Sequence, residues 1–206
     1  ADLSYASFAH SNLSGVNLDG ITLHSTNFAN ANLIGQDFTV ADSITDGSSF
    51  IQANLSNSNF EGVDLSPKEM YNSSFKNKAH LISGETIETP EVDFDMVKED
   101  LFGETSFILL IDVEVSGNDL YVTYLFYNNF GGANLENANF KNGVLWYANF
   151  DSADLTNANL SGADLTNANL SGANLSGANL SGANLSGTIG DENTNLNCKN
   201  HTICNS

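Results

Sequence analysis

The sequence predicts an all-β solenoid with four sides per coil, and a five-residue period is the first observation behind this prediction. Ala-Asn-Leu-Ser-Gly is written four times in succession over residues 168–187, and a looser Ala-(Asp/Asn)-(Leu/Phe) pattern fills about two thirds of the chain. Residues two apart in an extended chain share a face, so the small residue and the Leu or Phe of each repeat lie together. Because five is odd, the chain must bend once per repeat to keep them on one side. The repeats therefore predict a coil lined by Ala and by Leu or Phe.

Two further observations set the corners and the number of sides. Ser-Gly, Thr-Asn and Ser-Asn pairs follow many of the Leu and Phe residues, and these residue types tolerate turn dihedrals. A period of ten is superimposed, since Phe130, Phe140 and Phe150 alternate with Leu135 and Leu145. Ten residues are half of a four-sided coil of twenty but do not divide a three-sided coil of fifteen. We therefore expect about 20 residues per coil, with parallel pairing between neighbouring coils.

These repeats resemble the pentapeptide-repeat family over residues 1–38, 50–75 and 130–185. The resemblance implies a right-handed quadrilateral parallel β-helix with its Leu and Phe side chains in the lumen. The roles of the family range from DNA-mimicking protection of gyrase to developmental regulation. The resemblance thus implies a shape rather than an activity.

We expect six segments along the chain. They are coils at 1–40, a loop with a register shift at 41–49, coils at 50–77, an acidic insert at 78–127, coils at 128–187 and a C-terminal cap at 188–206. The loop is expected because Phe38 and Phe50 are not separated by a multiple of five residues, and the mismatch is a slip of two. A short loop at a solenoid corner is tolerated without having a function, and this is the interpretation we favour.

The insert contains two β-rich runs, residues 107–115 and 120–127, around a Gly-Asn pair. This pattern favours a β-hairpin, preceded by a linker at 89–102 with a short helix starting near Asp93. A second interpretation resumes the solenoid early. It rests on three residues that lie twenty positions before Leu145, Trp146 and Tyr147: Leu125, Phe126 and Tyr127.

Aromatic residues near the end of the insert suggest a docking surface. Trp146 and Tyr147 occupy outward positions after Leu145, and Phe126 and Tyr127 end the insert. We expect Trp146 and Tyr147 to cover apolar surface of the insert. The alternative is an aromatic patch that binds a partner.

The repeats fade after Gly187, where the open end of a solenoid needs a cover. Cys198 and Cys204 could close a small disulfide loop there. His201 lies between them, but two cysteines and one histidine without a fourth ligand make a weak metal site, so we expect no metal. Lumenal and periplasmic members of the family often end in a disulfide-bracketed segment, which this tail resembles. The resemblance implies the periplasm or the thylakoid lumen, with a cytoplasmic location as the alternative.

Charge separates the remaining functional classes. The chain has 25 acidic residues, six lysines and a formal net charge of −19, which argues against direct binding of nucleic acid. A DNA mimic that acts on gyrase would need its charge along the rod. Eleven acidic residues and two lysines instead lie in residues 78–127, against four acidic residues and one lysine in residues 128–187. The chain contains no run of eighteen apolar residues, so we expect no membrane span.

No group of residues predicts catalysis or a cofactor. The four histidines, His10, His24, His80 and His201, are far apart in the sequence and form no cluster. Asp93, Asp95, Glu99 and Asp100 could attract Ca²⁺, but they lack the ligand spacing of an EF-hand loop, so we expect a solvated acidic surface. We hypothesise a non-enzymatic structural or protein-interaction scaffold whose acidic insert contacts an unidentified protein, with the oligomeric state open. A DNA-mimicking gyrase-interacting protein is the alternative, and an ice- or polysaccharide-binding solenoid a minor one.

The Asn that precedes each Leu has a structural explanation. Stacked every twenty residues, these side chains could form hydrogen-bonded ladders along the outside of the rod. Identical repeats alone do not specify which coils are neighbours. We expect the Phe-containing coils and the insert to set this register.

Overall fold

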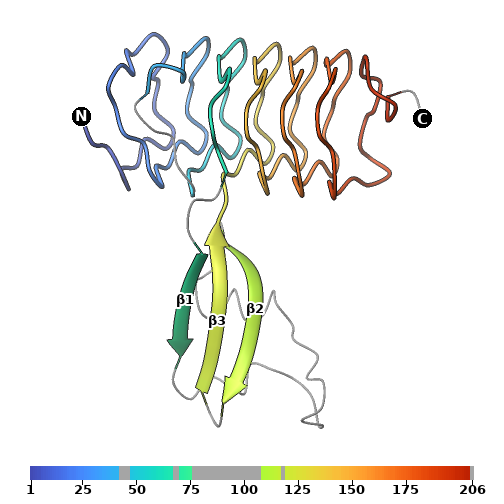
Figure 1. Ribbon diagram of the computed structural model, residues 1–206. Coiled ribbons are helices and arrows are strands. Elements are labelled where there is room, and N and C mark those ends of the chain that lie inside the picture. The colour runs from blue at the N-terminus through green and yellow to red at the C-terminus, as the bar shows by residue number, and fades with distance from the viewer. Residues whose placement is uncertain (42–46, 67–69, 76–107, 117–118, 205–206) are drawn as a thin grey trace. The chain divides into compact units, whose positions relative to one another are not determined.

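The structure, a computed structural model, describes residues 1–41, 47–66, 70–75, 108–116 and 119–204. The chain divides into a solenoid, formed by Ala1–Pro67 with Tyr127–Ser206, and an inserted unit, Lys68–Phe126 (Figure 1). The expected linker and helix at 89–102 lie outside the described residues. So does the acidic cluster of Asp93, Asp95, Glu99 and Asp100.

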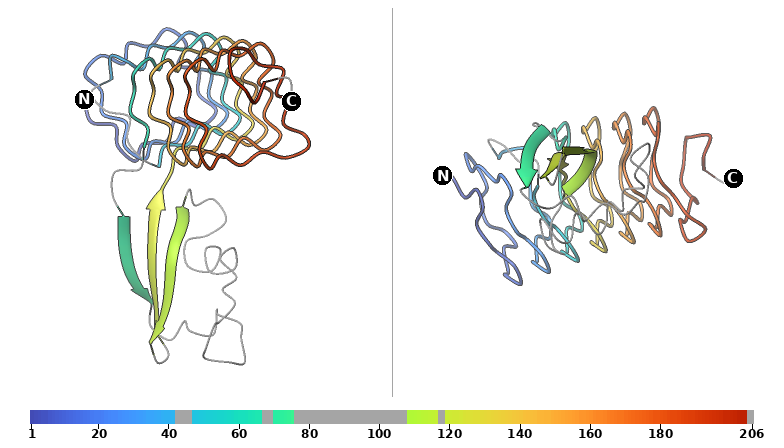
Figure 2. Two further views of the ribbon diagram at one scale, coloured as in Figure 1. Left: turned by 45° about the vertical axis from the view of Figure 1, so that its right-hand side comes forward. Right: turned by 90° about the horizontal axis from the view of Figure 1, so that it is seen from below.

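Parallel bridges join positions that lie 20 residues apart in the solenoid. One coil pairs with the next through Asn129↔Asn149, Asn134↔Asp154, Asn139↔Asn159 and Val144↔Asp164. Four bridges in each 20 residues give the coil its four sides, as the sequence predicts. Figure 2 shows successive coils lying in register on one another.

Nearly every described corner is a tight turn with one residue in the left-handed region, and Val40 is an exception. The Ala138 N–H donates to the Leu135 carbonyl at 3.0 Å, and Asn137 between them has a φ of 58°. Gly162 and Gly172 occupy the equivalent position with φ values of 68° and 63°. A type II turn requires a positive φ at its third residue, which Gly and Asn adopt readily. This requirement accounts for Gly or Asn at the second position after Leu.

The lumen is filled by the Leu, Phe and Ala residues of the repeats, and the Leu and Phe residues between Leu18 and Leu180 are almost fully buried. Two parallel columns of stacked rings run through its first part. One column is Phe8, Phe28, Phe50, Phe130 and Phe150, and the other is Phe38, Phe60 and Phe140. Rings of the two columns meet edge to face at 5.9–6.3 Å. Beyond Phe150 the lumen is aliphatic, so the aromatic coils differ in cross-section from the identical ones and help to set the register.

Two interruptions leave the coil register intact. Across the first, the bridges Asn27↔Ser49 and Asn32↔Asn54 join residues 22 apart, which is the predicted slip of two. The loop residues 42–46 are outside the described part of the chain. Across the inserted unit, the bridges span 80 residues, as in Asp64↔Val144.

The inserted unit contains a three-stranded antiparallel sheet in the order β1-β3-β2. Its strands are β1 (Met70–Phe75), β2 (Ile108–Ser116) and β3 (Asp119–Phe126). β2 and β3 form the antiparallel pair that the sequence favours. Their register runs from Ile108↔Phe126 to Ser116↔Asp119, with an irregularity between Leu110 and Asp112.

Two sequence-based expectations differ from this topology. The expected coils at 50–77 include Met70 and Phe75, but these residues form β1 and pair with β3. Lys68 stands where the repeat has a small lumenal residue, and a lysine cannot enter the lumen without burying a charge. The early resumption of the solenoid is also wrong, because Leu125 pairs antiparallel with Met70.

Replacing Phe130 with Ala should lower the free energy of unfolding by about 3 to 5 kcal/mol, because it opens a cavity between two stacked rings. Phe130 stacks on Phe50 and Phe150 at 4.9 Å each. Urea unfolding followed by circular dichroism measures the change. A loss no larger than that of an exposed-residue control, Ser181→Ala, would contradict the proposed role of the ring columns.

Candidate interaction surfaces

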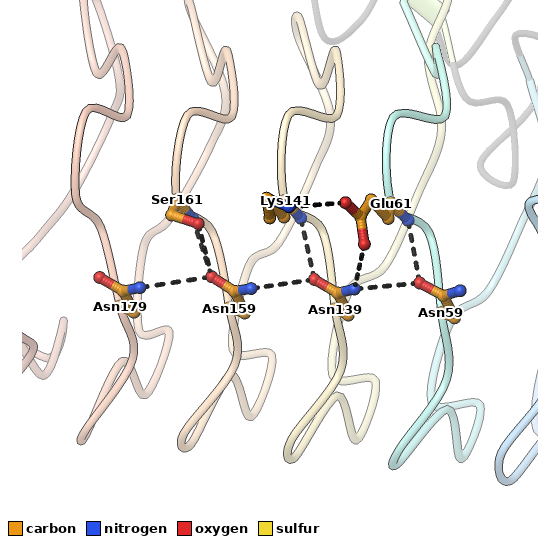
Figure 3. A network of polar contacts seen from close by, with 7 residues as sticks. All are labelled: Asn59, Glu61, Asn139, Lys141, Asn159, Ser161 and Asn179. Atoms are coloured by element: carbon orange, nitrogen blue, oxygen red, sulfur yellow. Dashed lines mark hydrogen bonds and ion pairs between the residues drawn. The ribbon is translucent and has the colours of Figure 1, made fainter.

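Side-chain amides form a continuous ladder on the side of the solenoid that contains Asn139 (Figure 3). The Nδ2 of each amide donates to an Oδ1 one coil earlier, at 3.1–3.4 Å. The chain of donors runs from Asn200 through Asn179, Asn159, Asn139 and Asn59 to the carboxylate of Asp37. Each inner Oδ1 also accepts a backbone N–H two residues on, such as that of Lys141 at 3.2 Å. The predicted Asn ladders are thus present.

Shorter ladders run along the other three sides. Their members are Asn129, Asn149 and Asn169; Asp154, Asn174 and Asn195; and Asp164 and Asn184. In these ladders and the longest one, Asp stands only at the N-terminal start. An ionised carboxylate accepts the next amide but cannot donate to the previous coil. Much of the outward polar chemistry of the described coils is therefore satisfied within the rod itself.

An ion pair lies beside the longest ladder. The Lys141 Nζ is 2.8 Å from Glu61 Oε1, and Asn139 donates to Glu61 Oε2 at 3.2 Å (Figure 3). The hydrogen bond from Lys141, followed by that from Asn139, holds the pKa of Glu61 below its ordinary value. Both charged side chains are more than two-fifths exposed, so this pair contributes little to stability.

Several departures from the repeat lie on the side that contains Leu145 and on the corner that follows it. We call this region the insertion corner and define it by Tyr5, His24, Ser66, Trp146 and Tyr147. The chain leaves the coil for the inserted unit after Asp64, which lies on this side, and returns at Asn129 on the next side, whereas the first interruption falls between Asp37 and Ser49. Tyr5 is 74% exposed and meets the His24 ring edge to face at 5.1 Å, and Trp146 is 44% exposed. This corner thus carries exposed aromatic rings beside a side that also has the ladder of Asp164 and Asn184.

Asn128 restores hydrogen bonds where the inserted unit interrupts the coil. In a regular corner the small residue donates its backbone N–H, as Ala148 does to Leu145 at 3.1 Å. The fully buried Asn128 instead donates its side-chain amide to the Leu65 carbonyl at 2.8 Å and accepts the Ser48 N–H at 3.1 Å. It thereby satisfies backbone groups that the departing chain would leave unpaired. Sequence reasoning missed this residue, although an Asn where the repeat has Ala was the available signal.

Trp146 lowers the pKa of a carboxylate on the next coil, that of Asp164. Asp164 also accepts the Thr166 hydroxyl at 2.5 Å and the Asn184 amide at 3.1 Å. Burial tends to raise the pKa of Asp164, but the hydrogen bonds from Thr166, Trp146 and Asn184 outweigh it and lower the pKa. The exposed Trp146 side chain thus acts on a carboxylate of the next coil.

The other predicted docking residues are divided between the two units. Tyr127 belongs to the solenoid unit, and burial raises the pKa of its hydroxyl. Phe126 ends β3 in the inserted unit. Docking of the insert on Trp146 and Tyr147 stays a prediction.

The C-terminal tail forms the expected cap with the expected disulfide. Cys198 and Cys204 are bonded, and Cys198 is 3% exposed at the end of the core. In the ranges that the structure describes, no group of three or more His, Cys, Asp or Glu side chains is placed to hold a metal ion. Nor does any helix in those ranges have the length and apolar character to span a bilayer.

Comparison with protein families agrees with this geometry. Eight copies of pentapeptide repeats match residues 1–39, 41–66, 119–157 and 148–187. The chain belongs to the pentapeptide-repeat family. Pentapeptide-repeat proteins are right-handed quadrilateral β-helices and are generally non-enzymatic structural or interaction proteins. None of the curated proteins matches the chain.

Solved pentapeptide-repeat structures are similar in part. A protein from the thylakoid lumen of Arabidopsis thaliana is 41% identical over 29% of this chain and 49% of its own, with a TM-score of 0.23. A protein from the cyanobacterium Cyanothece 51142, Rfr23, is 21% identical over 95% of this chain and 87% of its own, with a TM-score of 0.33. QnrB1, a plasmid-mediated fluoroquinolone resistance protein, is 15% identical over 93% and 94%, with a TM-score of 0.27. These low TM-scores leave the role of the chain to its own residues.

Replacing Asn159 with Asp should destabilise this pentapeptide-repeat solenoid by about 1 to 3 kcal/mol, because the amide that donates to Asn139 becomes a carboxylate facing an acceptor. Asn54→Asp is the matched control. The Asn54 Oδ1 accepts the Ser56 N–H, which a carboxylate also accepts, so its effect should stay within about 0.5 kcal/mol. Thermal unfolding at pH 7 measures both, and equal losses would contradict a directional ladder.

Trp146→Phe should raise the pKa of Asp164 towards its ordinary value of 3.8, because one hydrogen bond to the carboxylate is lost. A depressed folded-state pKa contributes stability that is present above the unfolded pKa and is lost as the pH falls through the folded pKa. At neutral pH the variant should therefore be less stable than the unmodified chain, and this difference in stability should shrink as the pH falls below about 4. NMR titration of the Asp164 carboxyl carbon measures the pKa, with Tyr147→Phe as control. An unchanged pKa in Trp146→Phe would disprove the assigned contact.

Proposed function

We propose that this pentapeptide-repeat protein is a non-enzymatic scaffold in which the inserted unit, Lys68–Phe126, contacts a protein partner. The observation that carries the proposal is the division of the chain into a regular solenoid and one inserted compact unit with its own sheet. Ladder amides such as Asn139 and Asn159 are hydrogen-bonded along the rod, so binding a partner there would exchange existing bonds for new ones. The inserted unit forms a sheet instead of coils, and its acid-rich sequence differs from that of the coils.

The charge of the insert indicates the kind of partner. Residues 78–127 contain eleven acidic residues and two lysines. Asp112 and Glu114 in β2 and Asp119 in β3 are the ionisable acids of the strands, which contain no lysine. An excess of one sign accelerates encounter with the opposite sign, so the expected partner surface is basic.

The described coils give less support to the alternative of a DNA mimic that acts on gyrase. Such a mimic needs carboxylates in a row along one side of the rod. Asp154 and Asp164 lie on different sides, and each accepts a ladder bond, from Asn174 and Asn184. A polysaccharide- or ice-binding face has a related difficulty, because these amides already take part in ladder bonds.

We propose an extracytoplasmic location, in the periplasm or the thylakoid lumen. The support is the bond between Cys198 and Cys204, since disulfides persist in oxidising compartments. Both cysteines of the chain take part in it.

Replacing residues 67–127 with a single Gly should leave a folded solenoid that no longer binds the partner. The replacement gives Leu65-Ser66-Gly-Asn128-Asn129-Phe130, so the two core residues are again five positions apart. Asn128 already bonds to Leu65 across the junction, which keeps the corner closed. Circular dichroism and thermal unfolding test the fold, and affinity capture from native extracts followed by mass spectrometry tests binding.

A charge variant separates the charge of the insert from its shape. Asp112→Asn, Glu114→Gln and Asp119→Asn together should retain the sheet and slow association with a basic partner. Full partner capture by the folded deletion variant would refute the proposal.

A gyrase supercoiling assay with the full chain and with the deletion variant tests the alternative of a DNA mimic. Inhibition of supercoiling by both proteins would assign the activity to the solenoid rather than to the insert.

A further inference from the structure

The C-terminal cap closes three of the four sides of the last complete coil. Ile189, Asn195 and Lys199 form parallel bridges to Asn169, Asn174 and Asn179 respectively. Backbone bonds run in both directions at the last of these sites. The Leu180 N–H donates to the Lys199 carbonyl at 3.0 Å, and the Lys199 N–H donates to the Ala178 carbonyl at 2.8 Å.

The disulfide lies next to this last bridge. Cys198 directly precedes Lys199 and is 3% exposed as part of the core, whereas Cys204 is only partly buried and packs against it. Leu196 and Ile203 also pack against the core. The bond ties the end of the chain back to the lumen across a separation of six residues, with the two Cα atoms 4.9 Å apart.

The segment after Lys199 has little regular structure of its own. Its described residues form a turn, in which the Cys204 N–H donates to the His201 carbonyl at 3.1 Å. The Asn200 side chain adds the last step of the long ladder through Asn179 at 3.1 Å. A short segment of this kind depends on its covalent cross-link, because the cross-link removes much of the entropy that the free segment would gain.

We propose that the Cys198–Cys204 bond is a redox-sensitive closure, and that its reduction opens the C-terminal end of the solenoid. Release of the tail removes the constraint that holds Cys198 over the lumen, so the Lys199 bridge frays. The backbone of Leu180 then loses its partner, and the apolar end of the core is exposed. An unpaired strand edge of this kind can pair with another chain. This switch concerns the end of the rod and does not depend on the role proposed for the insert.

The chemistry requires a dithiol reductant and no other reactant. A reductant thiolate attacks the Sγ of the more accessible Cys204, forms a mixed disulfide and displaces the Cys198 thiolate. The second reductant thiol then attacks the mixed disulfide and displaces the Cys204 thiolate. Two electrons pass to the protein, the two thiolates take up two protons, and the reductant leaves as its own disulfide.

Amide hydrogen exchange of the full chain tests the proposal, with dithiothreitol as the dithiol. The reporter is the Leu180 amide, and the reference is the Phe140 amide, which donates to Asn159 at 2.8 Å two coils away. We expect reduction to accelerate exchange at Leu180 on the order of tenfold or more and to leave Phe140 unchanged. Cys204→Ser, which leaves the buried Cys198 in place, should show the same acceleration without reductant.

Two results would overturn the proposal. Unchanged exchange at Leu180 in the fully reduced chain, verified by thiol titration, would mean that packing alone closes the end. Equal acceleration at Leu180 and Phe140 would mean that the disulfide stabilises the whole rod rather than its cap.

Discussion

The backbone hydrogen bonds between successive coils are the constraint on which the rest of the solenoid depends. The Leu135 N–H donates to the Asp154 carbonyl at 2.7 Å, and the Asp154 N–H donates back to the Ala133 carbonyl at 2.9 Å. These bonds form only where equivalent positions of neighbouring coils superimpose. Once they do, Asn stacks on Asn outside the rod and Phe stacks on Phe inside it. The ladders and ring columns therefore follow from the register and also reinforce it.

The same constraint limits where the rod can vary. A side must keep its register to bond to both neighbours, whereas the chain can leave and return between two sides if the lost backbone bonds are replaced. Asn128 provides such a replacement through Leu65 and Ser48. The insertion corner carries the exposed rings of Tyr5 and Trp146, and the chain leaves the coil beside it after Asp64. The other sides keep the same pairing from one coil to the next.

The sequence predicts the repetitive part well because one period fixes many contacts at once. The corner residues, the slip before Phe50 and the Asn ladders all follow from counting positions. The count misleads at Met70 and Phe75, which keep the five-residue spacing but form β1. The physical signal against a coil there is that Lys68 occupies the sequence position at which the repeat has a small lumenal residue. The contact between Asn128 and Leu65 could not be predicted, because it depends on where the chain leaves the coil and not on any spacing within it.

Lysine-directed cross-linking of the full chain to its captured partner tests most directly whether the insert makes the contact. Two of the six lysines, Lys141 and Lys199, belong to the solenoid, and the other four, Lys68, Lys76, Lys78 and Lys98, belong to the inserted unit. A scaffold that binds through its insert should give intermolecular cross-links from the four lysines of the inserted unit. Cross-links confined to Lys141 and Lys199 would show that the partner binds the rod and would contradict the account.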